Sequence, residues 1–123
     1  MRILPDTHAL LWWLQSSPRL GPRAQELIDD DDNPLLYSAV TLWEIRIKQA
    51  LGKLHHVERF QLIEESSVTE LPITHAHTQA AAALPPHHRD PFDRMLIAQA
   101  QLEDAVILTA DAAFAAYDVR VLW

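Results

Sequence analysis

The sequence contains no cysteine, and this absence excludes several kinds of site. Disulfide frameworks, thiolate zinc sites and iron–sulfur clusters all need cysteine, and a chain without it fits a reducing compartment. Only two glycines occur, which excludes phosphate-binding loops of the Gly-rich kind. No apolar run approaches the roughly 18 residues of a membrane span, and Asp6 comes too early for a secretory signal. We therefore expect a cytoplasmic protein without a membrane segment.

The length of 123 residues predicts one domain, residues 1–123, with a core of its own. The formal charge of −7 disfavours nonspecific attraction to nucleic acid, because phosphate binding depends on Lys and Arg. Part of that charge comes from the run of acids at 29–32, which reads as a solvated helix end. Several basic residues lie near Glu44 or Asp93 in the sequence and predict a local basic rim: Arg46, Lys48, Lys53, Arg89 and Arg94.

Short apolar runs alternate with helical patterns along the chain. The pattern predicts about five strands, at 3–4, 35–40, 68–71, 106–108 and 119–122. It predicts about seven helices, at 7–16, 22–30, 41–51, 57–65, 75–83, 91–103 and 111–116. Strands alternating with helices favour an α/β fold, with a parallel sheet covered on both faces.

Four acids, Asp6, Glu44, Asp93 and Asp111, stand where apolar runs give way to helix starts. The ends of parallel strands converge on one crevice, so these acids are predicted to meet. Each also has an ordinary structural explanation. Asp6 and Asp111 can be N-caps, Glu44 can close a capping box with Thr41, and Asp93 can sit in the first turn of its helix.

The joint pattern favours a metal site over four separate caps. Two carboxylates 4–5 Å apart repel each other by about 3–4 kcal/mol at an effective dielectric near 20, which a cation would offset. Oxygen ligands without cysteine or a His-x-x-x-His pair favour Mg²⁺ or Mn²⁺ over zinc. Such ions bind substrate phosphate, so the predicted chemistry is phosphodiester hydrolysis. The hydroxyls of Thr7, Ser38 and Thr109 are candidates for orienting a carboxylate or water, or for local turns and caps.

The seven histidines show no spacing that unites them at one site, and we assign none of them to catalysis. The apolar pair Trp12 and Trp13 lies on the first predicted helix. It predicts either a contact surface for a partner or part of the intramolecular core.

The chain resembles the PIN-domain family, specifically VapC-type toxins of toxin–antitoxin modules. The resemblance runs in order through nearly the whole chain. It rests on LPDTHALLWWL at 4–14, Ser38, LWEIRIK at 42–48, LGKL at 51–54, LPIT at 71–74, HRDPFDRMLIAQA at 88–100 and LTAD at 108–111. One departure is Pro5, where the family usually has an aliphatic strand residue, and the missing backbone donor weakens sheet pairing there.

The resemblance implies a three-layer α/β/α PIN fold and a Mg²⁺- or Mn²⁺-dependent endoribonuclease inhibited by a small antitoxin. Asp6, Glu44, Asp93 and Asp111 match the four acids of the family in order, and Asp90 matches an extra acid that also suits an N-cap. Homodimers are frequent in the family.

In this reading Asp6, Asp93 and Asp111 hold the metal, and Glu44 completes the pocket and positions the attacking water. Arg94, Lys48 or Arg46 would contact RNA phosphates. Two alternatives are a PIN-like binding module that has lost catalysis and a phosphoacceptor receiver domain. A receiver would want paired acids after the first strand, where this chain has one.

Overall fold

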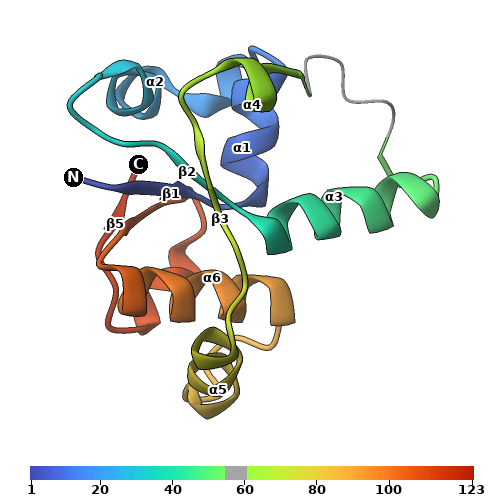
Figure 1. The fold of residues 1–123 in the computed structure, drawn as a ribbon, viewed down its shortest axis with the longest axis vertical. Helices are drawn as coiled ribbons and strands as arrows, with labels where there is room; N and C mark the ends of the chain where they lie inside the picture. Colours follow the sequence, from blue (N-terminus) through green and yellow to red (C-terminus); the bar gives the residue numbers. More distant parts are fainter. Residues whose placement is uncertain (55–60) are drawn as a thin grey trace.

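The computed structural model describes residues 1–54 and 61–123. The described strands are β1 (Ile3–Pro5), β2 (Leu36–Ser38), β3 (Thr69–Leu71), β4 (Val106–Leu108) and β5 (Val121–Leu122). The described α-helices are α1 (Thr7–Leu14), α2 (Pro22–Asp29), α3 (Ala39–Ala50), α4 (Gln61–Glu65), α5 (His75–Ala83) and α6 (Pro91–Glu103). Two short 3₁₀ helices, η1 (Pro18–Leu20) and η2 (Ala112–Ala116), complete the set (Figure 1). No helix in these ranges is long and apolar enough to cross a bilayer.

All the strand pairings are parallel, in the spatial order β3-β2-β1-β4-β5. The pairing of β1 with β2 is reduced to one bridge between Ile3 and Leu35. The amide of Ile3 donates to the carbonyl of Pro34, on the β2 side. Because strand residues alternate, Pro5 is the next residue that would donate to that side, and it has no N–H. The proline thus interrupts the ladder at the predicted place.

Alternating side chains of the central strands enter two separate cores. Leu4 and Ile107 pack with Ile97 of α6 and Phe114 of η2 on one face. Ile3, Val106 and Leu108 pack with α1 and α2 on the other face. Helices therefore cover both faces of a parallel sheet, as Figure 1 shows, and the predicted three-layer α/β/α architecture is confirmed.

Several predicted boundaries need correction. The strand predicted at 35–40 ends at Ser38, which caps α3 by accepting from the amide of Val40. Thr41 therefore lies inside the helix, where it is buried and its hydroxyl has no hydrogen-bond partner among the described residues, and the predicted capping box with Glu44 is wrong. The short helix predicted at 111–116 is the 3₁₀ helix η2, and β5 begins at Val121 rather than 119.

Other boundaries agree closely with the sequence pattern. Helices α5 and α6 have the predicted limits, and α1 ends two residues early, at Leu14. Gly52 has φ +70°, the left-handed conformation predicted for the end of α3. The first part of the helix predicted at 57–65 lies outside the described residues, and α4 is its described end.

Candidate metal centre

The register between β1 and β4 places two of the predicted acids at one edge of the sheet. Pro5 pairs with Leu108, so the next residues on each strand, Asp6 and Thr109, stand side by side. The Thr109 hydroxyl donates to Asp6 Oδ2 over 2.6 Å and accepts from the amide of Asp111. Thr109 therefore orients Asp6 directly and fixes the turn that carries Asp111, in agreement with its predicted supporting role.

Asp6 is both a capping residue and a buried acid. Its Oδ1 accepts from the amide of Ala9, so the predicted N-cap of α1 is present. Burial raises the pKa of Asp6, while the Thr109 and Ala9 hydrogen bonds lower it and the negative charge of Asp111 raises it. Each carboxylate oxygen keeps a second lone pair, so capping does not prevent this group from binding a cation.

Asp93 lies on the first turn of α6, which covers the face of the sheet opposite to α1. The helix begins at Asp90, whose Oδ1 accepts from the amides of Phe92 and Asp93. Burial raises the pKa of Asp93 to about 6, and the negative charges of Asp90 and Asp6 also raise it. The hydrogen bond with His88 and the charge of His88 both lower the pKa of Asp93. Asp6, Asp93 and Asp111 are thus close enough to share one electrostatic environment.

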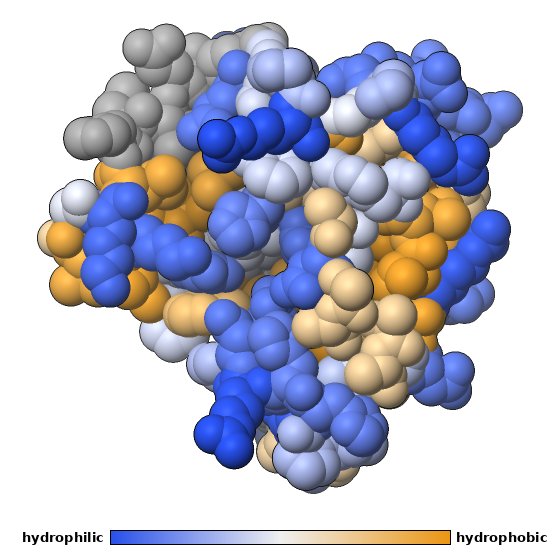
Figure 2. All heavy atoms as spheres, turned by 180° about the vertical axis from the view of Figure 1, so that it is seen from behind, coloured by the Kyte–Doolittle hydropathy of each residue, from blue (hydrophilic) through white to orange (hydrophobic). Residues whose placement is uncertain are grey.

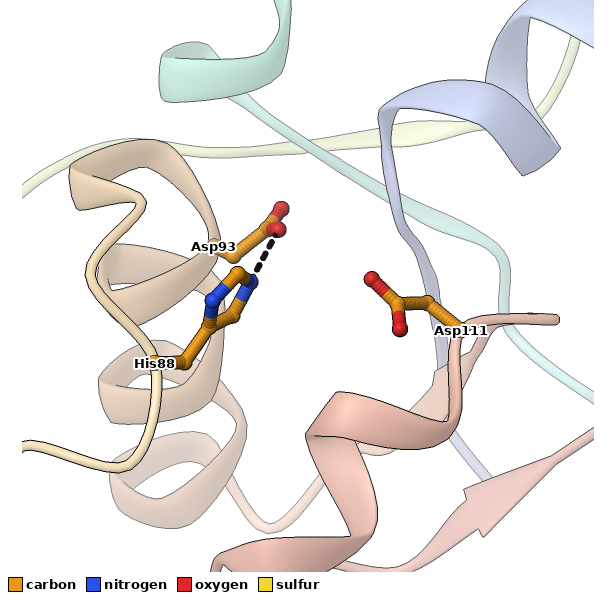
Figure 3. Close-up of side chains that lie close together, drawn as sticks. All are labelled: His88, Asp93 and Asp111. Atoms are coloured by element: carbon orange, nitrogen blue, oxygen red, sulfur yellow. Dashed lines mark hydrogen bonds and ion pairs between the residues drawn. The ribbon is translucent and has the colours of Figure 1, made fainter.

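His88 joins this group although the sequence assigned no role to it. Its Nε2 lies 2.7 Å from Asp93 Oδ2. One atom each from His88, Asp93 and Asp111 lie within 4.8 Å of one another, and all three side chains point into the same space (Figure 3). The histidine comes two residues before the N-cap Asp90, and its proximity depends on how the preceding loop folds back. No helical or strand spacing encodes that fold.

Glu44 occupies a neighbouring position rather than this cluster. It is buried on α3, where Oε1 accepts from the Thr7 hydroxyl over 2.6 Å and Oε2 lies 2.7 Å from Lys48 Nζ. Thr7 directly follows Asp6, so Glu44 is linked to the cluster through one residue. Lys48, predicted to contact RNA phosphate, neutralises Glu44 within the turn of the helix, and Arg46 lies exposed on α3.

Ser38 acts on the helices and not on an acid. Its hydroxyl donates to Gln99 Oε1 over 2.5 Å and accepts from the amide of Val40. These bonds connect the start of α3, which carries Glu44, with α6, which carries Asp93. The predicted orientation of a carboxylate by Ser38 is therefore replaced by an indirect effect on helix placement.

Arg94 also has a different role from the one predicted. Its guanidinium donates to the carbonyls of Pro85 and His88 through Nη1, and to those of Ala81 and Leu84 through Nη2. A guanidinium engaged by four carbonyls would have to give up these bonds to bind phosphate. We therefore correct the interpretation of Arg94 from an RNA contact to a residue that holds the loop before α6.

Tyr117 completes that loop attachment, and its loss has a measurable cost. Its hydroxyl donates to the Pro85 carbonyl over 2.7 Å and accepts from the His88 amide over 2.8 Å. We expect Tyr117→Phe to lower the free energy of unfolding by about 1–2 kcal/mol, because the amide loses its partner. Urea denaturation followed by circular dichroism measures the difference. The control is Tyr37→Phe, whose hydroxyl forms no hydrogen bond with the described residues; an equal loss there would contradict the expectation.

Two hollows meet at this edge of the sheet. A pocket of about 290 Å³ is lined by Asp6, Asp111, His8 and Trp12. A neighbouring groove of about 400 Å³ shares His8 and Trp12 and carries three basic side chains: Arg19, Lys48 and Lys53. The predicted basic rim therefore exists beside the acids, although its members differ from the predicted set. Trp12 and Trp13 are half-buried against the second core, and Trp12 forms a wall of both hollows.

A further hollow lies away from the acids. It measures about 660 Å³ and is lined by residues before β1, β4 and β5, including Arg2, Asp104 and Arg120. Its charges are mixed, and Arg2 approaches Glu103 in an ion pair at 4.0 Å. This is the opposite edge of the sheet from the carboxylates, where parallel α/β sheets seldom bind ligands.

Comparison with known proteins identifies the fold family. The PIN domain model matches residues 3–120 of the chain. Similar solved structures include VapBC2 from Rickettsia felis bound to a promoter DNA fragment (TM-score 0.74, 17% identity, 99% of this chain and 98% of that chain). FitAcB from Neisseria gonorrhoeae (TM-score 0.70, 23% identity) covers 98% of this chain and 96% of its own.

A third similar structure is DNA-bound VapBC from Salmonella typhimurium (TM-score 0.71, 13% identity, 99% of this chain and 97% of that chain). No curated protein matches significantly. At these identities the structures show the same fold, and the family match spans nearly the whole sequence. The chain therefore belongs to the PIN-domain family.

Proposed function

We propose that the chain is a divalent-metal-dependent endoribonuclease, the VapC-type toxin of a toxin–antitoxin module. The observation that carries the proposal is the cluster of Asp93 and Asp111 with His88, next to Asp6, which lines a pocket together with Asp111. Burial raises the pKa of Asp6 and Asp93, the charge of Asp111 adds to the rise at Asp6, and a cation would stabilise such an arrangement of carboxylates. PIN-family membership and the similarity to toxin–antitoxin structures support the same function.

The donor set fits Mg²⁺ or Mn²⁺. Carboxylate oxygens of Asp6, Asp93 and Asp111 would hold the ion, beside the pocket that Asp6 and Asp111 line. A bound ion of this kind supplies an activated water and stabilises the leaving oxygen of a phosphodiester.

The remaining work falls to side chains around this set. Thr109 keeps Asp6 facing the pocket, and the Asp90 cap fixes the first turn of α6, which carries Asp93. Glu44 accepts from Thr7 and pairs with Lys48, so both of its carboxylate oxygens are held in place near Asp6. We assign to Glu44 the role of positioning the attacking water.

The basic groove gives RNA a path to the acids. Arg19, Lys48 and Lys53 line it, and Trp12 and His8 separate it from the acidic pocket. Arg19 and Lys53 would neutralise phosphates in the groove, because Lys48 is paired with Glu44, and the ring of Trp12 offers a base a surface for stacking. The groove thus offers a local basic surface for RNA on a chain whose net charge of −7 otherwise disfavours binding to nucleic acid.

Removing single basic residues of the groove should weaken RNA binding without abolishing it. We expect Arg19→Ala and Lys53→Ala each to reduce affinity about three- to tenfold at low salt, and to reduce the slope of log affinity against log salt by about 0.7. Fluorescence anisotropy with a labelled single-stranded RNA measures both quantities. Arg120→Ala, at the opposite edge, is the matched control; an equal effect there would show that binding does not use the groove.

The proposed partners are RNA, a cognate antitoxin protein and a second copy of the chain. The antitoxin is supported by the similarity to VapBC and FitAcB. For a homodimer, Trp12 and Trp13 offer little free apolar surface, whereas Trp43 and Leu51 of the α3 region are 60% and 63% exposed. Helix α3 lies on the right in Figure 1 and therefore on the left in Figure 2, and an apolar area is visible on that side.

Neither alternative accounts for the site as well. A receiver domain needs paired acids after β1 and a lysine after the last but one strand, but Asp6 stands alone and Lys48 belongs to α3. A PIN-like module without catalysis would have no need for four acids in register, all of which are present. It remains the reading to adopt if a well-folded protein proves inactive.

The direct test is cleavage of a mixed pool of structured RNAs by the purified, antitoxin-free protein. Cutting with Mn²⁺ or Mg²⁺ that stops with EDTA would support the proposal. Cutting that continues in EDTA would contradict the role of the metal. No cutting by folded protein would favour the binding module.

A further inference from the structure

His88 is the one nitrogen donor in the described cluster of candidate metal ligands. Its Nε2 lies 2.7 Å from Asp93 Oδ2, and Asp111 faces both across the pocket (Figure 3). The imidazole is half-buried and its ring packs at 6.1 Å from the Phe114 ring. It therefore approaches the space between the two carboxylates from a defined side.

The spacing of these donors suits a single ion. In an octahedral site with bonds of about 2.1 Å, neighbouring donor atoms are about 3 Å apart and opposite ones about 4.2 Å apart. The separation of 2.7 Å between His88 and Asp93 resembles a neighbouring pair, and the 4.8 Å that bounds the whole group is slightly wider than an opposite pair. A small inward movement would complete the contacts.

The backbone of His88 is fixed by hydrogen bonds, as expected for a residue whose side chain binds a metal ion. The His88 amide donates to the Tyr117 hydroxyl, and its carbonyl accepts from Arg94 Nη1. The same arginine binds three further carbonyls at Ala81, Leu84 and Pro85. Two core elements, α6 and the segment after η2, thus fix the position of the histidine. A buried tyrosine and an arginine thus both bind the backbone of the one loop that lies beside the acids.

We propose that His88 supplies a nitrogen ligand to the bound cation, next to Asp93 and Asp111, and so biases the site toward Mn²⁺ over Mg²⁺. Imidazole is a softer donor than a carboxylate and suits transition ions, whereas Mg²⁺ prefers oxygen. Binding uses the neutral imidazole with its proton on Nδ1, so metal bonds replace the contact between Nε2 and Asp93. The inference rests on the proposed metal-dependent function and names a ligand for it.

The competing role is a contact from outside the metal shell. His88 could hold Asp93 by hydrogen bonding while only oxygens bind the ion. The two roles differ in whether nitrogen is bonded to the metal, which spectroscopy reads without any need for activity.

The experiment is pulsed electron paramagnetic resonance on the full-length protein loaded with Mn²⁺, with calorimetric titration of Mn²⁺ and Mg²⁺. We expect ¹⁴N modulation from a bonded imidazole in the wild type, lost in His88→Gln. His8→Gln is the matched control, because His8 lines the pocket of Asp6 and Asp111 but is exposed and outside the cluster. Mn²⁺ affinity should fall at least about tenfold in His88→Gln, and Mg²⁺ affinity less. His88→Asn serves as a second variant, with folding checked by circular dichroism.

The outcomes separate this inference from the proposed function. Mn²⁺ binding without nitrogen modulation, or modulation that survives in both His88 variants, would overturn ligation by His88 and leave the nuclease proposal standing. Equal losses of Mn²⁺ and Mg²⁺ affinity would overturn the metal bias. Failure of the wild type to bind either ion would overturn the metal site itself, and the proposed function with it.

Discussion

Asp6→Asn and Asp93→Asn are each expected to abolish metal-dependent RNA cleavage while the fold is retained. Each substitution removes one negative oxygen from a set that would hold a divalent ion, so the rate should fall by at least about 10³-fold, or about 4 kcal/mol of activation free energy. Asparagine caps helices as well as aspartate does, so α1 keeps its N-cap in Asp6→Asn. The measurement is the initial rate of RNA cleavage at saturating Mn²⁺.

The control for this result is an exposed acid far from the pocket. Asp104→Asn, at the left-handed end of α6, should cleave at the wild-type rate. Circular dichroism of all three variants must show the same helix content, so that loss of activity is not loss of structure. If either site variant cut RNA at more than about a tenth of the wild-type rate, that acid would be a cap and not a ligand.

The main features of the fold and the acids could be predicted because each has a local signal. The runs around Ile3, Leu36 and Ile107 are short and apolar, and they alternate with helical periods, which dictates a parallel sheet covered on both faces. Asp6 follows β1 and Asp111 lies three residues after β4, and the parallel pairing of these strands brings the two acids to one edge of the sheet. Even the weak pairing at Pro5 follows from a missing backbone donor.

The errors concern contacts that depend on distant residues. Thr41 fits a capping box by spacing, but Ser38 caps α3 instead, because its hydroxyl is also held by Gln99 from α6. Arg94 stands beside an acid in the sequence, yet its guanidinium donates to four carbonyls of α5 and of the segment between α5 and α6. Propensity and periodicity predict single helices and strands, but they do not predict which side chains of one element contact another element.

His88 illustrates the same limit within the site. Two prolines and the N-cap Asp90 surround it, which indicates a loop entering a helix. That signal says where the backbone turns but not which side chain faces Asp93. The direction is decided by Tyr117, which comes 29 residues later and binds the His88 amide.

Asp93→Asn should also stabilise the metal-free protein at neutral pH. Burial raises the pKa of Asp93 from 3.8 to about 6, so the folded chain holds its proton more tightly than the unfolded chain does. That contribution to stability is fully present below about pH 4 and is lost as the pH rises through about 6. Above that range the ionised, buried carboxylate costs about 3 kcal/mol, which a neutral amide avoids.

Thermal unfolding in EDTA measures this effect. At pH 7.5 we expect Asp93→Asn to melt about 10 °C above the wild type, with the gap closing toward pH 4. Asp31→Asn, an exposed acid in the loop after α2, is the control and should melt with the wild type. Saturating Mn²⁺ should reverse the order, because the ion stabilises only the protein that binds it. A variant less stable than the wild type at every pH, with or without metal, would mean that Asp93 is a structural acid and that its carboxylate does not destabilise the metal-free protein.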